Sequence, residues 1–128
     1  MKEDLACPVT TSLSVIGGKW KVIILWQLQG KVRRFGELQK SIQGISQKML
    51  TQELRDLEEH GLVQRRVYPV VPPKVEYRLT EFGKTLRPLM EQLSVWGSAY
   101  RKHIAELKSS AEPFEATTGE KELETVSA

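Results

Sequence analysis

Apolar residues recur at helical spacing along the first 60 residues, and glycines interrupt this pattern at several points. The pattern predicts a first helix that begins at Pro8, with Cys7 as its N-cap, and ends at the Gly17-Gly18 pair. A second helix is expected over about residues 19–28. Because that segment is apolar nearly all round, it should lie in the centre of the core.

Two more helices are expected before the hairpin. After a short extended segment at residues 32–34, the third helix covers about residues 35–42. The fourth covers residues 46–60, with Ser46 as its N-cap and Gly61 after its last turn. Its core-facing positions are Leu50, Leu54 and Leu57. Its opposite face is polar and consists of Gln47, Lys48, Thr51, Gln52 and Arg55.

A hairpin is predicted from two strand-like runs, residues 63–68 and 75–79, the second of which alternates strictly between apolar and polar positions. The connection contains three prolines, which cannot pair inside a sheet, so the tip should be stiff. Three cations are expected near this tip, where they could contact phosphates or the minor groove, or simply keep an edge strand solvated. They are Arg65, Arg66 and Lys74.

The last helical region should begin after an N-cap at Thr80 and reach about Leu107, and Pro88 inside it should kink or split it. Residues 109–128 are rich in Ser, Thr and Glu and are expected to be a disordered acidic tail. The sequence therefore predicts one domain over residues 1–108 followed by a tail.

This order of elements is typical of an α+β, mostly helical winged helix-turn-helix protein. An α-helix fits the major groove of DNA, where Gln pairs with adenine, Arg or Lys with guanine, and the methyl group of Thr contacts thymine. The first two turns of the fourth helix, up to Gln52, carry no acidic residue, and Asp56, Glu58 and Glu59 come at its far end. We therefore interpret the polar face of this helix as a DNA-reading surface rather than a merely solvated one.

Charge is consistent with a polyanionic partner. Residues 109–128 hold five glutamates and one lysine, a charge of −4, which leaves +7 on the other 108 residues out of a net +3. A further basic cluster of candidate phosphate contacts consists of Lys31, Arg33 and Arg34. No apolar run is long enough for a membrane span, and the first residues do not resemble a signal peptide, so a cytoplasmic protein is expected.

Metal, cofactor and catalytic chemistry have little support in the sequence. Cys7 is the only cysteine, and His60 and His103 have no companions at ligand spacing, so neither a metal site nor a cofactor is expected. No nucleophile–base pair stands out, and Gly17-Gly18-Lys19 lacks the rest of a phosphate-binding loop. The chain is expected not to be an enzyme. A winged helix used only for protein contacts is the other alternative.

The residues resemble the HxlR-type winged helix regulators of bacteria and archaea, within the MarR-like superfamily, over about residues 7–100. The segments that carry the resemblance are ordered along the chain: Cys7-Pro8-Val9, Ile16-Gly17-Gly18-Lys19-Trp20, Arg34-Phe35-Gly36-Glu37-Leu38, Gly44-Ile45-Ser46-Gln47-Lys48-Met49-Leu50-Thr51, Leu54-Arg55-Asp56-Leu57-Glu58, Gly61-Leu62-Val63, Pro72-Pro73-Lys74-Val75-Glu76-Tyr77 and Leu79-Thr80-Glu81-Phe82-Gly83.

The resemblance implies a homodimeric, sequence-specific regulator that binds a palindromic operator in duplex DNA. Its first and last helices would pair the protomers through two apolar stripes, although the same stripes could belong to the core of one chain. The stripes are Val9, Leu13 and Ile16, and Leu89, Leu93, Trp96 and Tyr100. Repression is expected, because a small protein can repress simply by occupying a promoter.

Cys7 is the candidate sensor of oxidants or electrophiles, since several members of this family respond through a cysteine at the matching position. The helix N-cap favours the thiolate independently of the resemblance. A small buried hydrophobe is the alternative reading of Cys7. The alternative switch is a small ligand bound non-covalently at the dimer interface near Trp20, Trp26 or Trp96, although tryptophans are more often part of a core.

Overall fold

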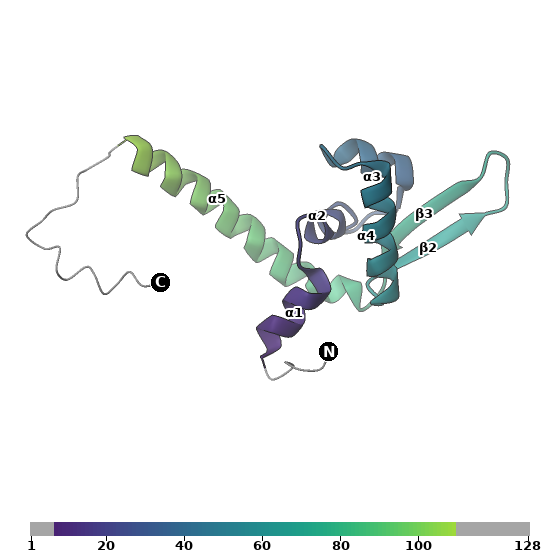
Figure 1. The fold of residues 1–128 in the computed structure, drawn as a ribbon, viewed down its shortest axis with the longest axis horizontal. Coiled ribbons are helices and arrows are strands. Elements are labelled where there is room, and N and C mark those ends of the chain that lie inside the picture. Colours follow the sequence, from purple (N-terminus) through teal and green to yellow (C-terminus); the bar gives the residue numbers. More distant parts are fainter. Residues whose placement is uncertain (1–6, 110–128) are drawn as a thin grey trace, which may run out of the picture. The chain divides into compact units, whose positions relative to one another are not determined.

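The computed structural model describes residues 7–109 and shows the predicted order of elements (Figure 1). The helices are α1 (Pro8–Ile16), α2 (Lys21–Gln27), α3 (Phe35–Ser41), α4 (Gln47–Glu59), the 3-10 helix η1 (Gly83–Leu86) and α5 (Arg87–Ser109). The strands are β1 (Arg33–Arg34), β2 (Val63–Tyr68) and β3 (Lys74–Leu79). The fold class, a mostly helical α+β winged helix-turn-helix, is confirmed.

The helix ends follow local signals that the sequence contains. Cys7 is the N-cap of α1 in extended conformation, and Pro8 opens that helix. The Ser46 hydroxyl accepts a hydrogen bond of 3.0 Å from the Met49 N–H, which caps α4. Gly44 has φ +87°, a left-handed conformation that lets the chain turn sharply between α3 and α4.

Pro88 splits the last helical region, one of the two outcomes expected from the sequence. Thr80 Oγ1 accepts a hydrogen bond of 2.9 Å from the Gly83 N–H at the start of η1. The 3-10 helix then gives way to α5 at Arg87, so Pro88 falls in the first turn of α5, where its missing N–H leaves no helical bond unmade. Ser109 ends α5, and the predicted tail beyond it lies outside the described residues.

The three strands form an antiparallel sheet in the order β1-β3-β2. Val63 pairs with Leu79 at one end of the hairpin and Tyr68 with Lys74 at the other. Leu79 and Tyr77, on the inner face of β3, are buried in the helical core. Their burial leaves the alternate residues of both strands on the outer face of the sheet.

The core is apolar and draws mainly on α2, α3, α4 and the inner face of the sheet. Its buried members are Ile16, Ile24, Leu25, Leu28, Leu38, Ile42, Ile45, Leu50, Leu54, Leu57, Leu62, Val63, Tyr77, Leu79 and Met90. The three leucines predicted on the inner face of α4 are among them. The expectation for α2 holds only in part, because Ile23 and Trp26 reach the surface.

The described residues divide between Gln92 and Leu93 into two compact units, the winged unit and the C-terminal part of α5. Of the helices in residues 7–109, none is both long and apolar enough to cross a membrane.

Candidate DNA interface

The outward face of α4 presents the five polar side chains that the sequence selected. Gln47, Lys48, Thr51, Gln52 and Arg55 line one shallow depression of about 550 Å³. All of them are exposed except Thr51, which is partly buried. Within residues 7–109, the side chains of Gln47, Lys48, Gln52 and Arg55 form no hydrogen bond or ion pair with the protein, so their polar groups are available to a ligand.

Thr51 is held in place by its own helix. Its hydroxyl donates a hydrogen bond of 2.9 Å to the carbonyl oxygen of Gln47, one turn earlier. The hydroxyl is thereby occupied, and the methyl group is left as the chemically distinct part of the side chain. This arrangement suits contact with an apolar group such as the methyl of thymine.

A part-buried ion pair fixes α4 against α2, and the sequence reasoning missed it. Lys21 Nζ lies 2.6 Å from Glu53 Oε1 and 3.3 Å from Asp56 Oδ2. The hydrogen bond to Glu53 is the main cause that raises the pKa of Lys21. Glu53 and Asp56 thus face α2 and stay off the outward face of α4. The signal in the sequence was that Glu53 and Asp56 are acidic and three positions apart on a helix whose opposite face carries basic residues, so they share one face of that helix.

The positions of the basic residues on the hairpin differ from the prediction. Lys74 pairs with Tyr68 at the tip end of the hairpin, as expected, but Arg65 and Arg66 pair with Tyr77 and Glu76 in the middle of the strands. The prediction that these two arginines lie near the tip is therefore wrong. The physical reason is the strand register, in which Tyr68 and Lys74 form the last pair before the turn and Arg66 lies two residues away from it.

Arg65 and Arg66 also point to opposite faces of the sheet, because they are neighbours on one strand. Arg65 Nε lies 3.5 Å from Glu58 Oε1, so Arg65 ties β2 to the C-terminal end of α4. Arg66 lies on the outer face, with its guanidinium carbon 4.8 Å from the ring centroid of Tyr68. Of these two arginines, Arg66 alone lies on the outer face of the sheet, whereas the Arg65 side chain faces α4 and remains 46% exposed.

The basic cluster before α3 is divided in the same way. Arg33 Nε donates a hydrogen bond of 3.2 Å to the carbonyl oxygen of Gln27 and is partly buried. The side chains of Lys31 and Arg34 are exposed. The backbone N–H of Arg34 donates to Glu37 Oε1 over 2.8 Å, which fixes the start of α3. Arg34 and Lys31 remain accessible, and Arg33 has a structural role.

Cys7 is exposed at the N-terminus of α1. The backbone N–H and the hydroxyl of Thr10, together with the backbone N–H of Val9, lower the pKa of the Cys7 thiol. These groups act from nearby, although none of them completes a side-chain cap of ordinary hydrogen-bond geometry. Within residues 7–109 nothing covers Cys7, which does not favour the alternative of a buried hydrophobic cysteine.

The pKa of Cys7 leads to a direct prediction. The rate of alkylation by iodoacetamide is expected to rise with pH around a midpoint below the ordinary pKa of a cysteine thiol. Thr10→Val removes only the hydroxyl contribution and should move the midpoint upward, while Thr11→Val serves as the matched control on the next residue. Mass spectrometry of the alkylated protein across a pH series measures both midpoints. An unperturbed midpoint in the unmodified sequence would contradict the N-cap effect.

The tryptophans do not form the core that the sequence suggested. Trp20 is partly buried against the core, but Trp26 is 41% exposed and Trp96 is 64% exposed. Trp96 stacks on Tyr100 within α5, with ring centroids 5.4 Å apart. In the part of the chain that the structure describes, no group of three histidine, cysteine or acidic side chains is arranged to hold a metal ion.

Comparison with known proteins identifies the family. The model of the HxlR-like helix-turn-helix family matches residues 15–105. The chain belongs to the HxlR-like helix-turn-helix family. It is 49% identical over 104 residues to the HTH-type transcriptional regulator YdeP of Bacillus subtilis, and the aligned segment covers 81% of each of the two chains. This HxlR-like chain is therefore a helix-turn-helix transcriptional regulator that binds DNA, and the expectation that it is not an enzyme agrees with its relatives.

Solved structures support the same assignment for the fold of this HxlR-like protein. The redox regulator HypR in its reduced form superposes with a TM-score of 0.74 at 47% identity, covering 78% of this chain and 99% of that one. Its oxidised form gives a TM-score of 0.70 at 50% identity, over 73% and 96% of the two chains. A MarR-family regulator from Porphyromonas gingivalis W83 gives 0.72 at 40% identity, over 77% and 96%.

Proposed function

We propose that this HxlR-like regulator is a homodimeric repressor that binds a palindromic operator through α4 and the wing. The observation that carries the proposal is the outward face of α4, where four polar side chains that have no partner among residues 7–109 line one depression with Thr51. Ser46 caps the helix, and the first N–H groups of α4 favour a phosphate at that end. Lys74 at the wing, with Lys31 and Arg34, would supply further phosphate contacts. Binding at a promoter would then exclude the polymerase.

The test is a mobility shift on the DNA upstream of the protein's own coding region, with random duplex as competitor and a series of salt concentrations. We expect a specific complex whose affinity falls steeply as salt rises, because phosphate contacts release counterions. Binding no tighter than to random DNA would contradict the operator proposal. Absence of any salt-dependent binding would favour the reading in which the winged helix serves protein contacts alone.

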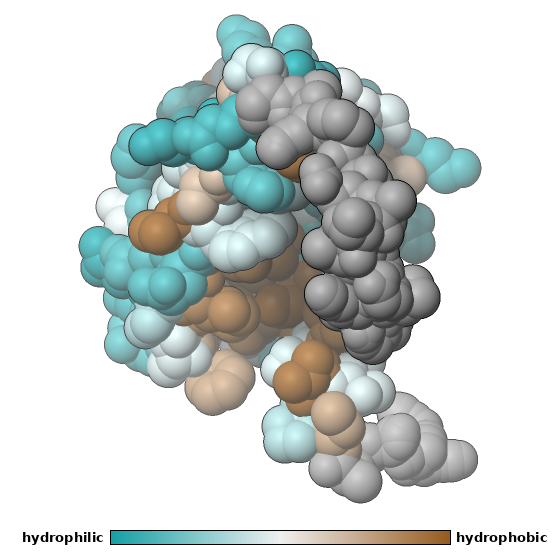
Figure 2. All heavy atoms as spheres, turned by 90° about the vertical axis from the view of Figure 1, so that its left-hand side faces the viewer, coloured by the Kyte–Doolittle hydropathy of each residue, from teal (hydrophilic) through white to brown (hydrophobic). Residues whose placement is uncertain are grey.

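The homodimer would use apolar side chains that α1 and α5 each leave at the surface. Hydrophobic residues, in brown, are exposed on the face of the molecule shown in Figure 2. Val9 and Leu13 of α1 are 64% and 61% exposed, and Trp96 of α5 is exposed to a similar extent. Large exposed apolar side chains at helical spacing are typical of an interface. Trp96→Glu is expected to convert the dimer to a monomer in analytical ultracentrifugation, whereas Arg101→Glu on the same helix should not. A monomer in the unmodified protein would contradict the proposal.

Cys7 would be the redox switch of this dimer. Its exposure and lowered pKa support the proposal, and HypR, a redox regulator, is among the structural relatives. An oxidant would remove two electrons and two protons from two thiols and join Cys7 of the two protomers, provided their Cα atoms lie within about 7 Å. The other modifications of Cys7 that would act as the switch are a mixed disulfide with a small thiol and S-alkylation.

The mobility shift is therefore repeated with and without diamide on the unmodified protein and on Cys7→Ser. Operator affinity is expected to change on oxidation in the unmodified protein and to stay constant in Cys7→Ser. Equal affinities in all four samples would refute the switch. A change in affinity that a small molecule causes equally in Cys7→Ser would favour a non-covalent ligand at the dimer interface.

A further inference from the structure

The outer face of the sheet carries a cluster of charged residues that the DNA-reading helix does not use. The strand register pairs Gln64 with Arg78, Arg66 with Glu76, and Tyr68 with Lys74, and these residues share the face that points away from the core. Strand β1 adds Arg34, which pairs with Glu76. The face therefore holds four cations and one acid, with Arg34, Arg66, Lys74 and Arg78 as the cations.

The negative charge of Glu76, the acidic residue on this face, is already compensated by two neighbouring side chains. The Tyr68 hydroxyl donates a hydrogen bond of 2.9 Å to Glu76 Oε1, and Lys74 Nζ lies 3.7 Å from Glu76 Oε2. The same hydrogen bond is the main cause that raises the pKa of Tyr68. Within residues 7–109, neither Arg66 nor Arg78 forms an ion pair with a carboxylate. Their two positive charges, like that of Arg34, are therefore not compensated by a carboxylate among the described residues.

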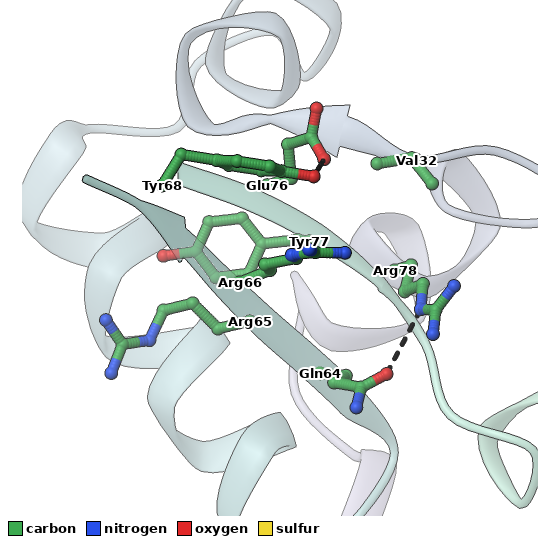
Figure 3. Close-up of a pocket in the computed structure, with 8 residues that line it drawn as sticks. All are labelled: Val32, Gln64, Arg65, Arg66, Tyr68, Glu76, Tyr77 and Arg78. Atoms are coloured by element: carbon green, nitrogen blue, oxygen red, sulfur yellow. Dashed lines mark hydrogen bonds between the residues drawn. The ribbon is translucent and has the colours of Figure 1, made fainter. Parts of the chain in front are cut away.

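Both arginines line one hollow of about 350 Å³ on the sheet (Figure 3). The Arg66 guanidinium packs over the Tyr68 ring, while Arg78 Nε donates a hydrogen bond of 3.1 Å to Gln64 Oε1. Figure 3 shows Arg66 between the Tyr68–Glu76 pair and the Arg78–Gln64 pair, with Arg65 directed away. Each guanidinium is thus oriented by one neighbour and still has N–H groups to donate.

We propose that this hollow is a phosphate-binding site formed by the guanidinium groups of Arg66 and Arg78 and the side-chain amide N–H groups of Gln64. Residues on diagonal positions of neighbouring strands lie about 7–8 Å apart, a separation that two arginines can bridge onto one tetrahedral anion. Two uncompensated charges match a phosphate better than a single carboxylate. The phosphate belongs either to the backbone of bound duplex DNA, in which case the site rests on the proposed function, or to a soluble phosphorylated molecule.

Arg78→Gln is the test variant, because Arg78 is exposed and its side chain forms no hydrogen bond to a described residue other than Gln64. Arg87→Gln is the matched control, an arginine that is also exposed and lies outside the sheet. The first arm measures DNA binding by fluorescence anisotropy across a salt series. The second arm titrates pyrophosphate, without DNA, into isotope-labelled protein and follows the backbone amide signals of β2 and β3 by NMR.

If the site takes a DNA phosphate, Arg78→Gln lowers the slope of log affinity against log salt by about one per protomer, and Arg87→Gln leaves it unchanged. If it takes a soluble molecule, the DNA slope is unchanged, and pyrophosphate shifts the amide signals of β2 and β3 in the unmodified protein but not in Arg78→Gln. Failure of both arms, or an equal loss of slope in Arg87→Gln, overturns the site. A protein that binds no DNA refutes the proposed function alone, because the pyrophosphate arm still decides the site.

Discussion

Arg55→Ala is expected to weaken operator binding by about 1–3 kcal/mol, roughly 5- to 150-fold, and to relax the base preference at one operator position. Arg55 lies one turn beyond Thr51 on the outward face of α4, and its guanidinium has no hydrogen bond or ion pair with any described residue. An unpaired guanidinium on a helix that enters the major groove is suited to bidentate contact with guanine. The variant is expected to lose this contact and to keep its fold, because Arg55 is exposed.

Fluorescence anisotropy with the operator, with single-base variants of it and with random duplex measures this effect. Arg87→Ala is the control, since Arg87 is also exposed but forms an ion pair with Glu91 in α5. A loss of equal size on operator and random DNA would assign Arg55 to a phosphate instead of a base. Unchanged affinity for every duplex would show that the outward face of α4 does not enter the groove.

Leu57→Ala is expected to lower the free energy of unfolding by about 2–5 kcal/mol, because it removes a fully buried side chain and leaves a cavity. Leu57 is 0% exposed and lies on the inner face of α4, toward the core that α2 and β2 share with it. The same helix carries the candidate DNA-reading residues on its other face. The stability of the fold and the placement of those residues therefore depend on the same packing.

Urea denaturation at a fixed protein concentration measures the loss, since the stability of a dimer changes with concentration. Met49→Ala is the matched control on the same helix, because Met49 is 41% exposed. We expect the control to lose less than about 1 kcal/mol. If Leu57→Ala also lost less than about 1 kcal/mol, the core around α4 would have to relax and fill the cavity left by the leucine side chain.

The candidate interface could be read from the sequence to a large extent because its main element is local. The α4 helix has its cap, its apolar period and its polar face within 14 residues, and side chains at helical spacing share a face whatever the rest of the fold does. The same holds for α1, where Pro8 fixes the helix start and places Cys7 at its N-cap.

Features that join distant segments could not be read in this way. The alternation of β2 predicts that Arg65 and Arg66 face opposite sides, but only the packing of the sheet on α4 decides which of them meets Glu58. Likewise the ion pairs of Lys21 with Glu53 and Asp56 link two helices about 30 positions apart in the chain. Nothing in either segment alone requires that pairing.

The sequence by itself therefore determined the order of elements, the family and the polar face of α4, because caps, glycines and periodicity act between near neighbours along the chain. Only the tertiary structure decided which cations remain accessible, which tryptophans reach the surface and how β2 and β3 bring Arg66 and Arg78 to one hollow. The physical reason is that exposure and charge pairing are set by contacts between segments, and those contacts exist only after the helices and the sheet have packed around one core.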